Sequence, residues 1–428
     1  MGKSLAKILA TAAVLALTAG GVHAKETVIW WDFLGGGDGI RMKKLIADFN
    51  AEHKDTIEIQ GTTLDWGVPF YTKVQTSAAV GEGPDIMTYH ASRIPLAIDQ
   101  GTLTEITADD LKTIGLGEAD FAPATWAAAH GADGKLYALP FDTHPIVLYY
   151  NKTLLEKAGL IGDNGLPKDL NGIDNFTAAM EKVKAAGAKW GLSTYNSNGD
   201  FAYRTIYSLF GQQDGVALSD KGEWFAGDNA DKLAKALQVV SDWVKNKVSP
   251  PYTDYPSTVA LFTSGQAAFM INGVWEVPTM NDLADQKKLG FEWGAIELPV
   301  FFGHPSTYED SHTFAIPNNI GKPQTPEKHA AVLEIMKWME AHALFWATAG
   351  HIPANQHVTD SAEYKAMQPQ ATYAVLTKNG LFDPKSKYAG VAGAVFEAAA
   401  NHFTAAVNNE TDAASAVKAM KEELDALD

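Results

Sequence analysis

The sequence predicts an α/β protein with two lobes, and three observations carry that prediction. Residues 27–60 read as a strand, an amphipathic helix and a second strand, the order that opens an α/β sheet. The 404 residues that follow the first 24 are enough for roughly two domains. Asp133–Leu155 leaves one predicted strand at Pro140, exposes a short polar stretch and enters another strand, as a hinge between two lobes does.

Residues 1–24 have the composition of a secretory signal peptide. Lys3 and Lys7 form a basic start, residues 8–19 are apolar, and small residues precede position 25. The apolar run is too short to span a membrane. The chain has no cysteine, so we expect no lipid-modified cysteine, disulfide or thiolate metal site. Export without a lipid anchor indicates a periplasm.

The charge of the chain argues against two classes of partner. Removing residues 1–24 takes away two lysines and no acidic residue, so the formal charge falls from −17 to −19. Such a chain is repelled by nucleic acid and by anionic lipid. We therefore expect the chain to bind neither. Separately, we expect it to be a monomer.

The first lobe is expected to contain residues 25–141 and 311–349. A strand at 27–33 leads through a glycine-rich turn into a helix at 40–53 that buries Leu45, Ile46 and Phe49. The turn has the backbone to cradle phosphate but lacks the spacing of a nucleotide-binding loop, so we expect it to bend the strand toward a cleft. Polar residues follow the strand at 85–89, where ligands of α/β sheets collect.

The second lobe is expected to contain residues 142–310 and 350–428. Its predicted helices cover 175–186, 201–210, 229–245 and 410–427, and its predicted strands cover 190–194, 267–271 and 292–298. The helix at 326–342 belongs to the first lobe. Gly350–Pro353 breaks the chain and is a natural second crossing between the lobes.

Aromatic residues recur where strands end, at Trp31, Trp66, Tyr89, Phe201 and Trp275. Aromatic faces pack against the C–H faces of a pyranose, while polar neighbours bind its hydroxyls. For a single aromatic residue, burial in a core is the more common explanation. Trp66 and Trp275 stand in turn sequences, so we expect these two to face a cleft.

Only three of the 34 basic residues are arginines, and all three lie near segments expected at the cleft. A guanidinium can hold vicinal hydroxyls, a carboxylate or a sulfonate with two parallel hydrogen bonds. Arg93 is the first choice, followed by Arg41 and Arg204. The alternative is that each arginine pairs with a nearby carboxylate of the chain.

The histidines and carboxylates leave the chemistry of the site open. The twelve histidines include no metal-binding spacing, so we expect no metal, and His90, His144, His312 and His351 are expected at the lobe edges as hydrogen-bonding groups. Carboxylates suited to sugar hydrolysis or to accepting sugar hydroxyls are Asp32, Asp65, Asp142, Glu276 and Asp310.

Four segments together resemble the extracellular solute-binding proteins of family 1, the carbohydrate-binding subunits of bacterial ABC importers, with a maltose-binding-protein-like layout. They are GEGPDIM at 81–87, GKLYALPFDTHPIVLYYNKTLL at 134–155, GQAAFMINGVW at 265–275 and GHIP at 350–353. The resemblance implies two lobes, each with a mostly parallel sheet flanked by helices, that close on a ligand.

The resemblance also implies contacts by position. Sugar contacts are expected at Tyr89, Ser92 and Arg93, at Asp142, Thr143 and His144, and at a stacking tryptophan, Trp275. The sequence departs from maltodextrin binders at Ser92 and His144, where those proteins carry a carboxylate, so the resemblance does not extend to a preference for maltodextrin.

The expected function is capture of a small carbohydrate and its delivery to the membrane permease of an ABC importer, without catalysis or a cofactor. A secreted glycoside hydrolase, a binder of an acidic or sulfonated sugar and an anion or metal scavenger remain alternatives. The expected ligand-binding residues are Trp31, Asp32, Arg41, Asp65, Trp66, Tyr89, His90, Ser92, Arg93, Asp142, Thr143, His144, Asn198, Phe201, Arg204, Gly273, Trp275, His312 and His351.

Overall fold

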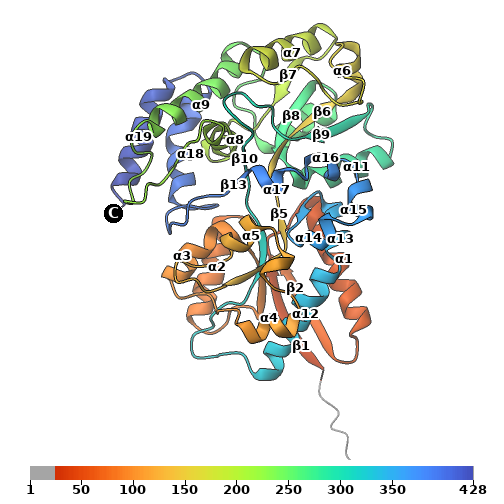
Figure 1. The fold of residues 1–428 in the computed structure, drawn as a ribbon, viewed down its shortest axis with the longest axis vertical. Coiled ribbons are helices and arrows are strands. Elements are labelled where there is room, and N and C mark those ends of the chain that lie inside the picture. The colour runs from red at the N-terminus through yellow and green to blue at the C-terminus, as the bar shows by residue number, and fades with distance from the viewer. Residues whose placement is uncertain (1–24, 428) are drawn as a thin grey trace, which may run out of the picture.

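Two lobes stand one above the other in the computed structural model, which describes residues 25–427 (Figure 1). The expected signal peptide, residues 1–24, lies outside the described residues. Each lobe has a central sheet with helices packed around it, so the two-lobe α/β fold predicted from the sequence is confirmed. Among residues 25–427, no helix is both long and apolar enough to cross a membrane.

The first lobe is built on a five-stranded sheet. Across the sheet, the strands are β2 (Ile57–Thr63), β1 (Glu26–Asp32), β3 (Ile86–His90), β11 (His312–Ala315) and β4 (Ala138–Pro140). β1 is parallel to β2 and β3, whereas β11 is antiparallel to β3 and β4. The buried core of this lobe joins residues 28–141 to residues 314–354.

Helices cover both faces of this sheet (Figure 1). In α1, Leu45, Ile46 and Phe49 are buried as the sequence predicts, but the helix begins earlier, inside the glycine-rich turn. The helices are α1 (Gly36–Glu52), α2 (Val68–Ala79), α3 (Ile94–Asp99), α4 (Ala108–Ile114), α5 (Pro123–Ala128), α12 (Pro326–Ala341) and α13 (Ala343–Trp346), with 3-10 turns η1 (Ala91–Arg93), η2 (Glu118–Asp120) and η4 (Ala347–Ala349).

The second lobe is built on a four-stranded sheet. Across it, the strands are β7 (Trp190–Ser193), β8 (Ala267–Gly273), β6 (Ile146–Asn151) and β9 (Trp293–Ile296). The surrounding helices are α6 (Lys152–Lys157), α7 (Ile173–Ala185), α8 (Gly199–Gly211), α9 (Asn229–Lys245), α10 (Tyr255–Thr263), α11 (Val277–Asp285), α18 (Ala394–Val407) and α19 (Ala413–Asp425), with the 3-10 turn η3 (Val274–Glu276). Its main core joins residues 146–308 to residues 389–424.

Both sheets are mixed, with one strand in each that runs against the others. In the first lobe β11 runs against the other strands, and in the second lobe β6 does so, as their antiparallel pairings with both neighbours show. β11 and β6 are the strands that the chain enters from the junction, whereas the others run toward it. The carboxyl ends of the remaining strands therefore point at the space between the lobes, where α/β proteins bind ligands.

Three segments of the chain cross between the lobes and are hydrogen-bonded to one another. β5 (Asp142–Thr143) pairs with β12 (Ile352–Pro353), and the backbone N–H of His144 donates to the carbonyl of Asp310 at 2.9 Å. The sequence singled out two of these crossings, at 133–155 and 350–353. The third, around Asp310, follows β10 (Thr307–Tyr308), which pairs with β13 (Gly380–Leu381).

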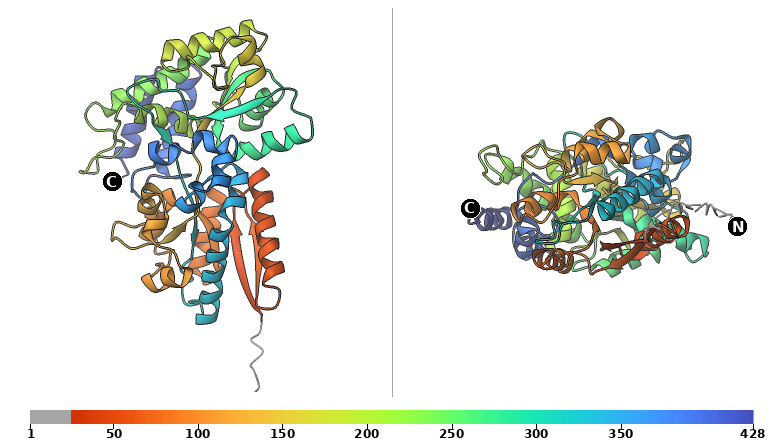
Figure 2. Two further views of the ribbon diagram at one scale, coloured as in Figure 1. Left: turned by 45° about the vertical axis from the view of Figure 1, so that its right-hand side comes forward. Right: turned by 90° about the horizontal axis from the view of Figure 1, so that it is seen from below.

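Short helices fill the junction on one side, visible in blue between the lobes (Figure 2). Part of this region packs with β6 and β8 of the second lobe in a small separate core that also includes Ala347 and Ile352. The helices are α14 (Gln356–Thr359), α15 (Ala362–Ala366), α16 (Gln370–Tyr373) and α17 (Leu376–Asn379).

Candidate functional site

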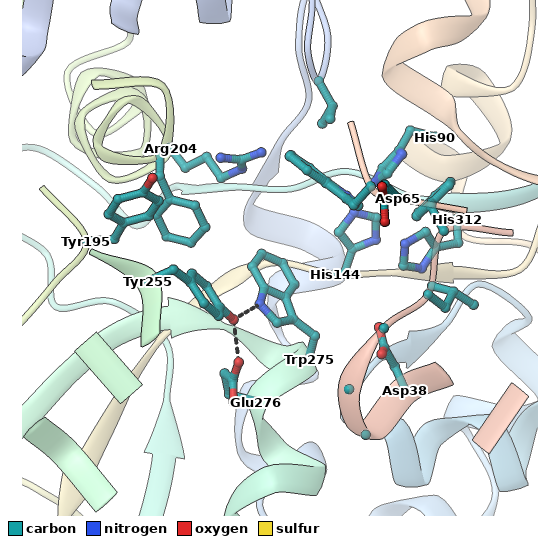
Figure 3. A pocket seen from close by; sticks show the side chains of 18 of the residues that line it. Asp38, Asp65, His90, His144, Tyr195, Arg204, Tyr255, Trp275, Glu276 and His312 are labelled. Atoms are coloured by element: carbon teal, nitrogen blue, oxygen red, sulfur yellow. Dashed lines mark hydrogen bonds between the residues drawn. The ribbon is translucent and has the colours of Figure 1, made fainter. Parts of the chain in front are cut away.

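A cavity of about 710 Å³ lies between the lobes and is lined by residues of both. That volume falls within the range of small-molecule pockets. Figure 3 shows side chains of the second lobe, with Tyr195, Arg204, Tyr255, Trp275 and Glu276, facing Asp38, Asp65, His90 and His312 of the first. Loops that follow β1, β2, β3, β7 and β8 supply most of the lining.

Trp275 is held in place by a short chain of hydrogen bonds. Its Nε1–H donates to the Tyr255 hydroxyl at 2.8 Å, and that hydroxyl in turn donates to the Glu276 carboxylate. Gly273 makes this geometry possible, because a Cβ at that position would lie 2.1 Å from the Trp275 ring. Burial raises the pKa of Glu276. The indole is therefore a fixed, partly exposed platform on the cavity wall.

Aromatic rings reach the cavity from both lobes. Trp66 is 48% exposed and lies edge-on to His90, with ring centroids 6.4 Å apart. Phe201 lies edge-on to Trp275 at 6.4 Å. Phe201 stands in the first turn of α8, which the Asn198 side chain caps by accepting from the backbone N–H of Asp200. The cap fixes the start of α8, and so it fixes where Phe201 and Arg204 lie on the cavity wall.

The glycine-rich turn after β1 also lines the cavity, through Gly35, Gly36, Gly37 and Asp38. It passes close to the preceding backbone, since a Cβ at Gly39 would lie 2.2 Å from the Leu34 carbonyl oxygen. Burial raises the pKa of Asp38 to about 7, although the nearby His312 and a hydrogen bond from the backbone N–H of Gly39 both act to lower it. The turn thus bends into the cleft, as the sequence predicts.

Asp142 is the centre of a buried polar cluster beneath the cavity. Its carboxylate accepts hydrogen bonds from Trp346 Nε1 at 2.6 Å, His312 Nδ1 at 2.9 Å and the backbone N–H of His312 at 2.9 Å. His144 Nδ1 lies 3.3 Å away. Burial alone would raise the pKa of Asp142, but the facing imidazoles, His312 first, hold it well below its usual value. Burial also opposes protonation of His312, yet Asp142 raises its pKa.

The histidines gather in a way that sequence spacing did not indicate. Asp142, His144, His312 and His351 have possible metal-ligating atoms within 4.8 Å of one another, and so do His90, His144 and Asp310. The rings of His144 and His312 are stacked, with centroids 4.1 Å and planes 20° apart. Because imidazole binds a metal in its own plane at about 2 Å, two stacked rings are poorly arranged to share one ion. The geometry favours a hydrogen-bonded cluster.

Eight of the nineteen expected ligand-binding residues line the cavity. They come from both lobes and are Asp65, Trp66, His90, His144, Phe201, Arg204, Trp275 and His312. Whether they contact a ligand stays a prediction.

The other eleven expected residues lie outside the cavity lining, and most have partners within the protein. Arg41 forms an ion pair with Asp282 at 3.2 Å, and Arg93 stacks on Tyr71 with its guanidinium 4.4 Å from the ring centroid. Asp32 accepts from the backbone N–H of Leu34, Ser92 donates to Asp310, and Asn198 caps α8. The remaining six are Trp31, Tyr89, Asp142, Thr143, Gly273 and His351, the last five of which are buried.

The cavity also contains residues that the sequence did not single out as ligand contacts. Tyr195, Asp200, Tyr255, Thr279 and Tyr308 line it. Tyr255 is the first residue of α10 and precedes Trp275 by 20 residues, beyond the reach of a local spacing pattern, so the sequence does not reveal their hydrogen bond. Asp38 could have been predicted as a cavity residue, because it stands in the glycine-rich turn that the sequence places near the cleft.

The fold and the site define a two-lobe binding protein with its cavity at the junction, and comparisons with known proteins agree. The family model for the bacterial extracellular solute-binding proteins matches residues 44–372. The chain therefore belongs to that family.

Two curated relatives are similar over most of their length. A maltodextrin-binding protein of Bacillus subtilis is 25% identical over 370 residues, which cover 80% of this chain and 78% of that protein. An sn-glycerol-3-phosphate-binding periplasmic protein of Brucella abortus is 25% identical over 304 residues, covering 68% of this chain and 66% of that protein.

Solved structures share the fold at lower identity. The GacH receptor of Streptomyces glaucescens, known unliganded and with acarbose, superposes with a TM-score of 0.77 at 18% identity, covering 93% of this chain and 97% of that one. A maltose-bound protein of T. maritima gives a TM-score of 0.76 at 21% identity, covering 94% and 99%.

Proposed function

We propose that the chain is a periplasmic sugar-binding protein that captures a small carbohydrate between its lobes and delivers it to an ABC importer permease. The cavity carries this proposal. Its wall combines Trp275, Trp66 and Phe201 with several carboxylates and imidazoles. Aromatic faces beside hydrogen-bonding groups suit the apolar faces and hydroxyls of a sugar.

Closure of the lobes would couple ligand capture to delivery. We propose hinge points at residues 141–142, 310–311 and 349–350, where the three crossing segments lie. A ligand that touches both lobes favours the closed state by its differential affinity for that state. The permease would then bind the closed form.

The names of the relatives support a binding function rather than an enzymatic one. They are described as binding proteins for maltodextrin, sn-glycerol 3-phosphate and galactooligosaccharide. A glycoside hydrolase is the competing proposal, because Asp65, Asp38, Asp200 and Glu276 all line the cavity. Incubation of the protein with the bound oligosaccharide separates the two, since a binding protein returns its ligand intact.

A thermal-shift screen over neutral, acidic and sulfonated sugars tests the proposal. Ligands that bind only the native state raise the melting temperature. We expect at least one sugar to raise it in a saturable manner, and phosphate or metal ions not to do so. The opposite pattern would favour an anion or metal scavenger.

Size-exclusion chromatography with light scattering checks the proposed monomer, and N-terminal sequencing of the exported protein checks cleavage after residue 24.

A further inference from the structure

Of the three arginines, only Arg204 lines the cavity. Within residues 25–427, Arg41 is the one arginine that has a carboxylate oxygen within 4.0 Å of its guanidinium nitrogens. Arg93 lies outside the cavity, against the Tyr71 ring. The arginine at the cavity is therefore Arg204 rather than Arg93, the first choice from the sequence.

Arg204 is packed among aromatic rings and is almost buried, with 3% of its surface exposed. Its guanidinium carbon lies 4.9 Å from the ring centroids of Phe201 and Phe396, and 5.7 Å from those of Tyr308 and Trp66. Trp66 belongs to the first lobe, so the ring cage is completed across the cleft. Rigid surroundings of this kind fix the direction of the guanidinium fork.

The hydrogen-bonding capacity of this guanidinium is largely unused. A guanidinium offers five N–H donors, and the protein takes one of them, through a 3.5 Å contact from Nη1 to the Asp200 carbonyl. None of its nitrogens is among the described polar atoms that are buried without a partner. The free N–H groups thus reach the open cavity, and Figure 3 shows the guanidinium directed away from α8 into it.

The charge of Arg204 acts on Asp383, but burial raises the pKa of that carboxyl to about 8. A buried positive charge without an anion in direct contact is costly, and that cost falls when a ligand supplies the anion. We propose that the physiological ligand is a sugar that carries an oxyanion, a carboxylate or a sulfonate, and that Arg204 is the residue that binds it. This inference rests on the proposed sugar-binding function. It adds the chemical class of the ligand and the position of its charged group.

Two of the four carboxylate residues that line the cavity are compatible with such a ligand. Asp38 and Glu276 have raised pKa values because of burial, so both hold a proton to a higher pH than usual and repel an anion less. Trp275 stands between Glu276 and the first lobe (Figure 3). A sugar ring stacked on Trp275 would have its acidic group toward Arg204 and hydroxyls toward the carboxylates.

Calorimetry with matched pairs of sugars tests the proposal. The pairs are glucuronate against glucose, galacturonate against galactose, and a 6-sulfonated glucose against glucose, with glucose 6-phosphate as the phosphate arm. We expect the acidic member of at least one pair to bind at least tenfold tighter. Arg204→Gln should remove that preference, whereas Arg204→Lys, which keeps the charge but loses the fork, should keep part of it.

Lys73→Gln is the control for loss of charge. Lys73 is an exposed residue of α2 outside the cavity, so its removal should leave the ratio of acidic to neutral affinity unchanged. Melting temperatures show that each variant is folded. A wild type that prefers the neutral member of every pair, or an Arg204→Gln variant with the wild-type ratio, would overturn the inference but leave the proposed sugar binding intact. Absence of binding by every sugar would instead overturn both.

Discussion

At the scale of single residues, Trp275 is the side chain on which sugar binding should depend most. Its position is set by Tyr255 and Gly273, and it packs, only partly buried, against the edge of the second lobe's core. We predict that Trp275→Ala weakens binding of the best sugar at least tenfold in calorimetry while the melting temperature changes little, because stacking area is lost from a cavity wall. Trp126→Ala is the matched control. Trp126 stacks on Phe121 away from the cavity, so affinity should stay at the wild-type value.

Glu309 gives a prediction about pH. It is 1% exposed in the crossing segment between β10 and β11, and burial raises its pKa to about 8 from a usual value of 4.5. Between these values the folded protein keeps a proton that the unfolded chain releases, so this residue costs increasing stability as the pH rises from 4.5 to 8.

Glu309→Gln removes that ionisation. We expect the variant to melt at a higher temperature than the wild type at pH 8, with the difference shrinking toward pH 4.5. Differential scanning calorimetry over this range measures it, and a difference that does not depend on pH would contradict the assignment.

The residue scale also shows where the sequence was informative. Trp66 and Trp275 could be predicted because turn residues flank them, and turns rarely bury their side chains. Which arginine faces the cavity could not be predicted, since that depends on how α8 is rotated against Phe396 and Tyr308, far away in the chain. The cluster around Asp142 brings together residues of three separate segments, and its contacts have no counterpart in local spacing.

At the scale of elements, the crossing at Gly350 is closely packed against the second lobe. Gly350 has φ of +91°, and a Cβ there would lie 2.0 Å from the carbonyl oxygen of Val274. We predict that Gly350→Ala lowers the free energy of unfolding by clearly more than about 1 kcal/mol, since both the backbone conformation and the space forbid a side chain.

Gly134→Ala separates these two causes. Gly134 has φ of +78° but no atom within 4 Å of a Cβ position, so its substitution should cost only the backbone strain. Urea unfolding of both variants measures the difference. Equal losses would show that the close approach to Val274 is unimportant.

Helices and strands were the most predictable feature of the fold. The helix expected at 229–245 is α9, and the helix expected at 326–342 ends one residue earlier as α12, because apolar periodicity reports a helix directly. Strand direction was not predictable in the same way. β11 and β6 run against their neighbours because the chain enters each of them from the junction, and that is a property of the whole topology.

At the scale of the whole molecule, several ion pairs and hydrogen bonds join the lobes beyond the crossing segments. One is the ion pair between Arg41 on α1 and Asp282 on α11, which joins the lobes at the rim of the cleft. Partly exposed pairs of this kind contribute about 0–1 kcal/mol. An ion pair this weak can break and re-form at little cost as the lobes move.

Ligand-driven closure is the central claim, and a cross-lobe distance tests it most directly. The chain has no cysteine, so single cysteines placed at the exposed residues Val80 and Val216, one in each lobe, can be labelled specifically. Double electron–electron resonance then measures the distribution of distances with and without the best sugar of the thermal-shift screen. We predict that saturating sugar shifts the distribution, and that Trp275→Ala at the same sugar concentration stays close to the free state. An unchanged distribution in the saturated wild type would contradict capture between closing lobes.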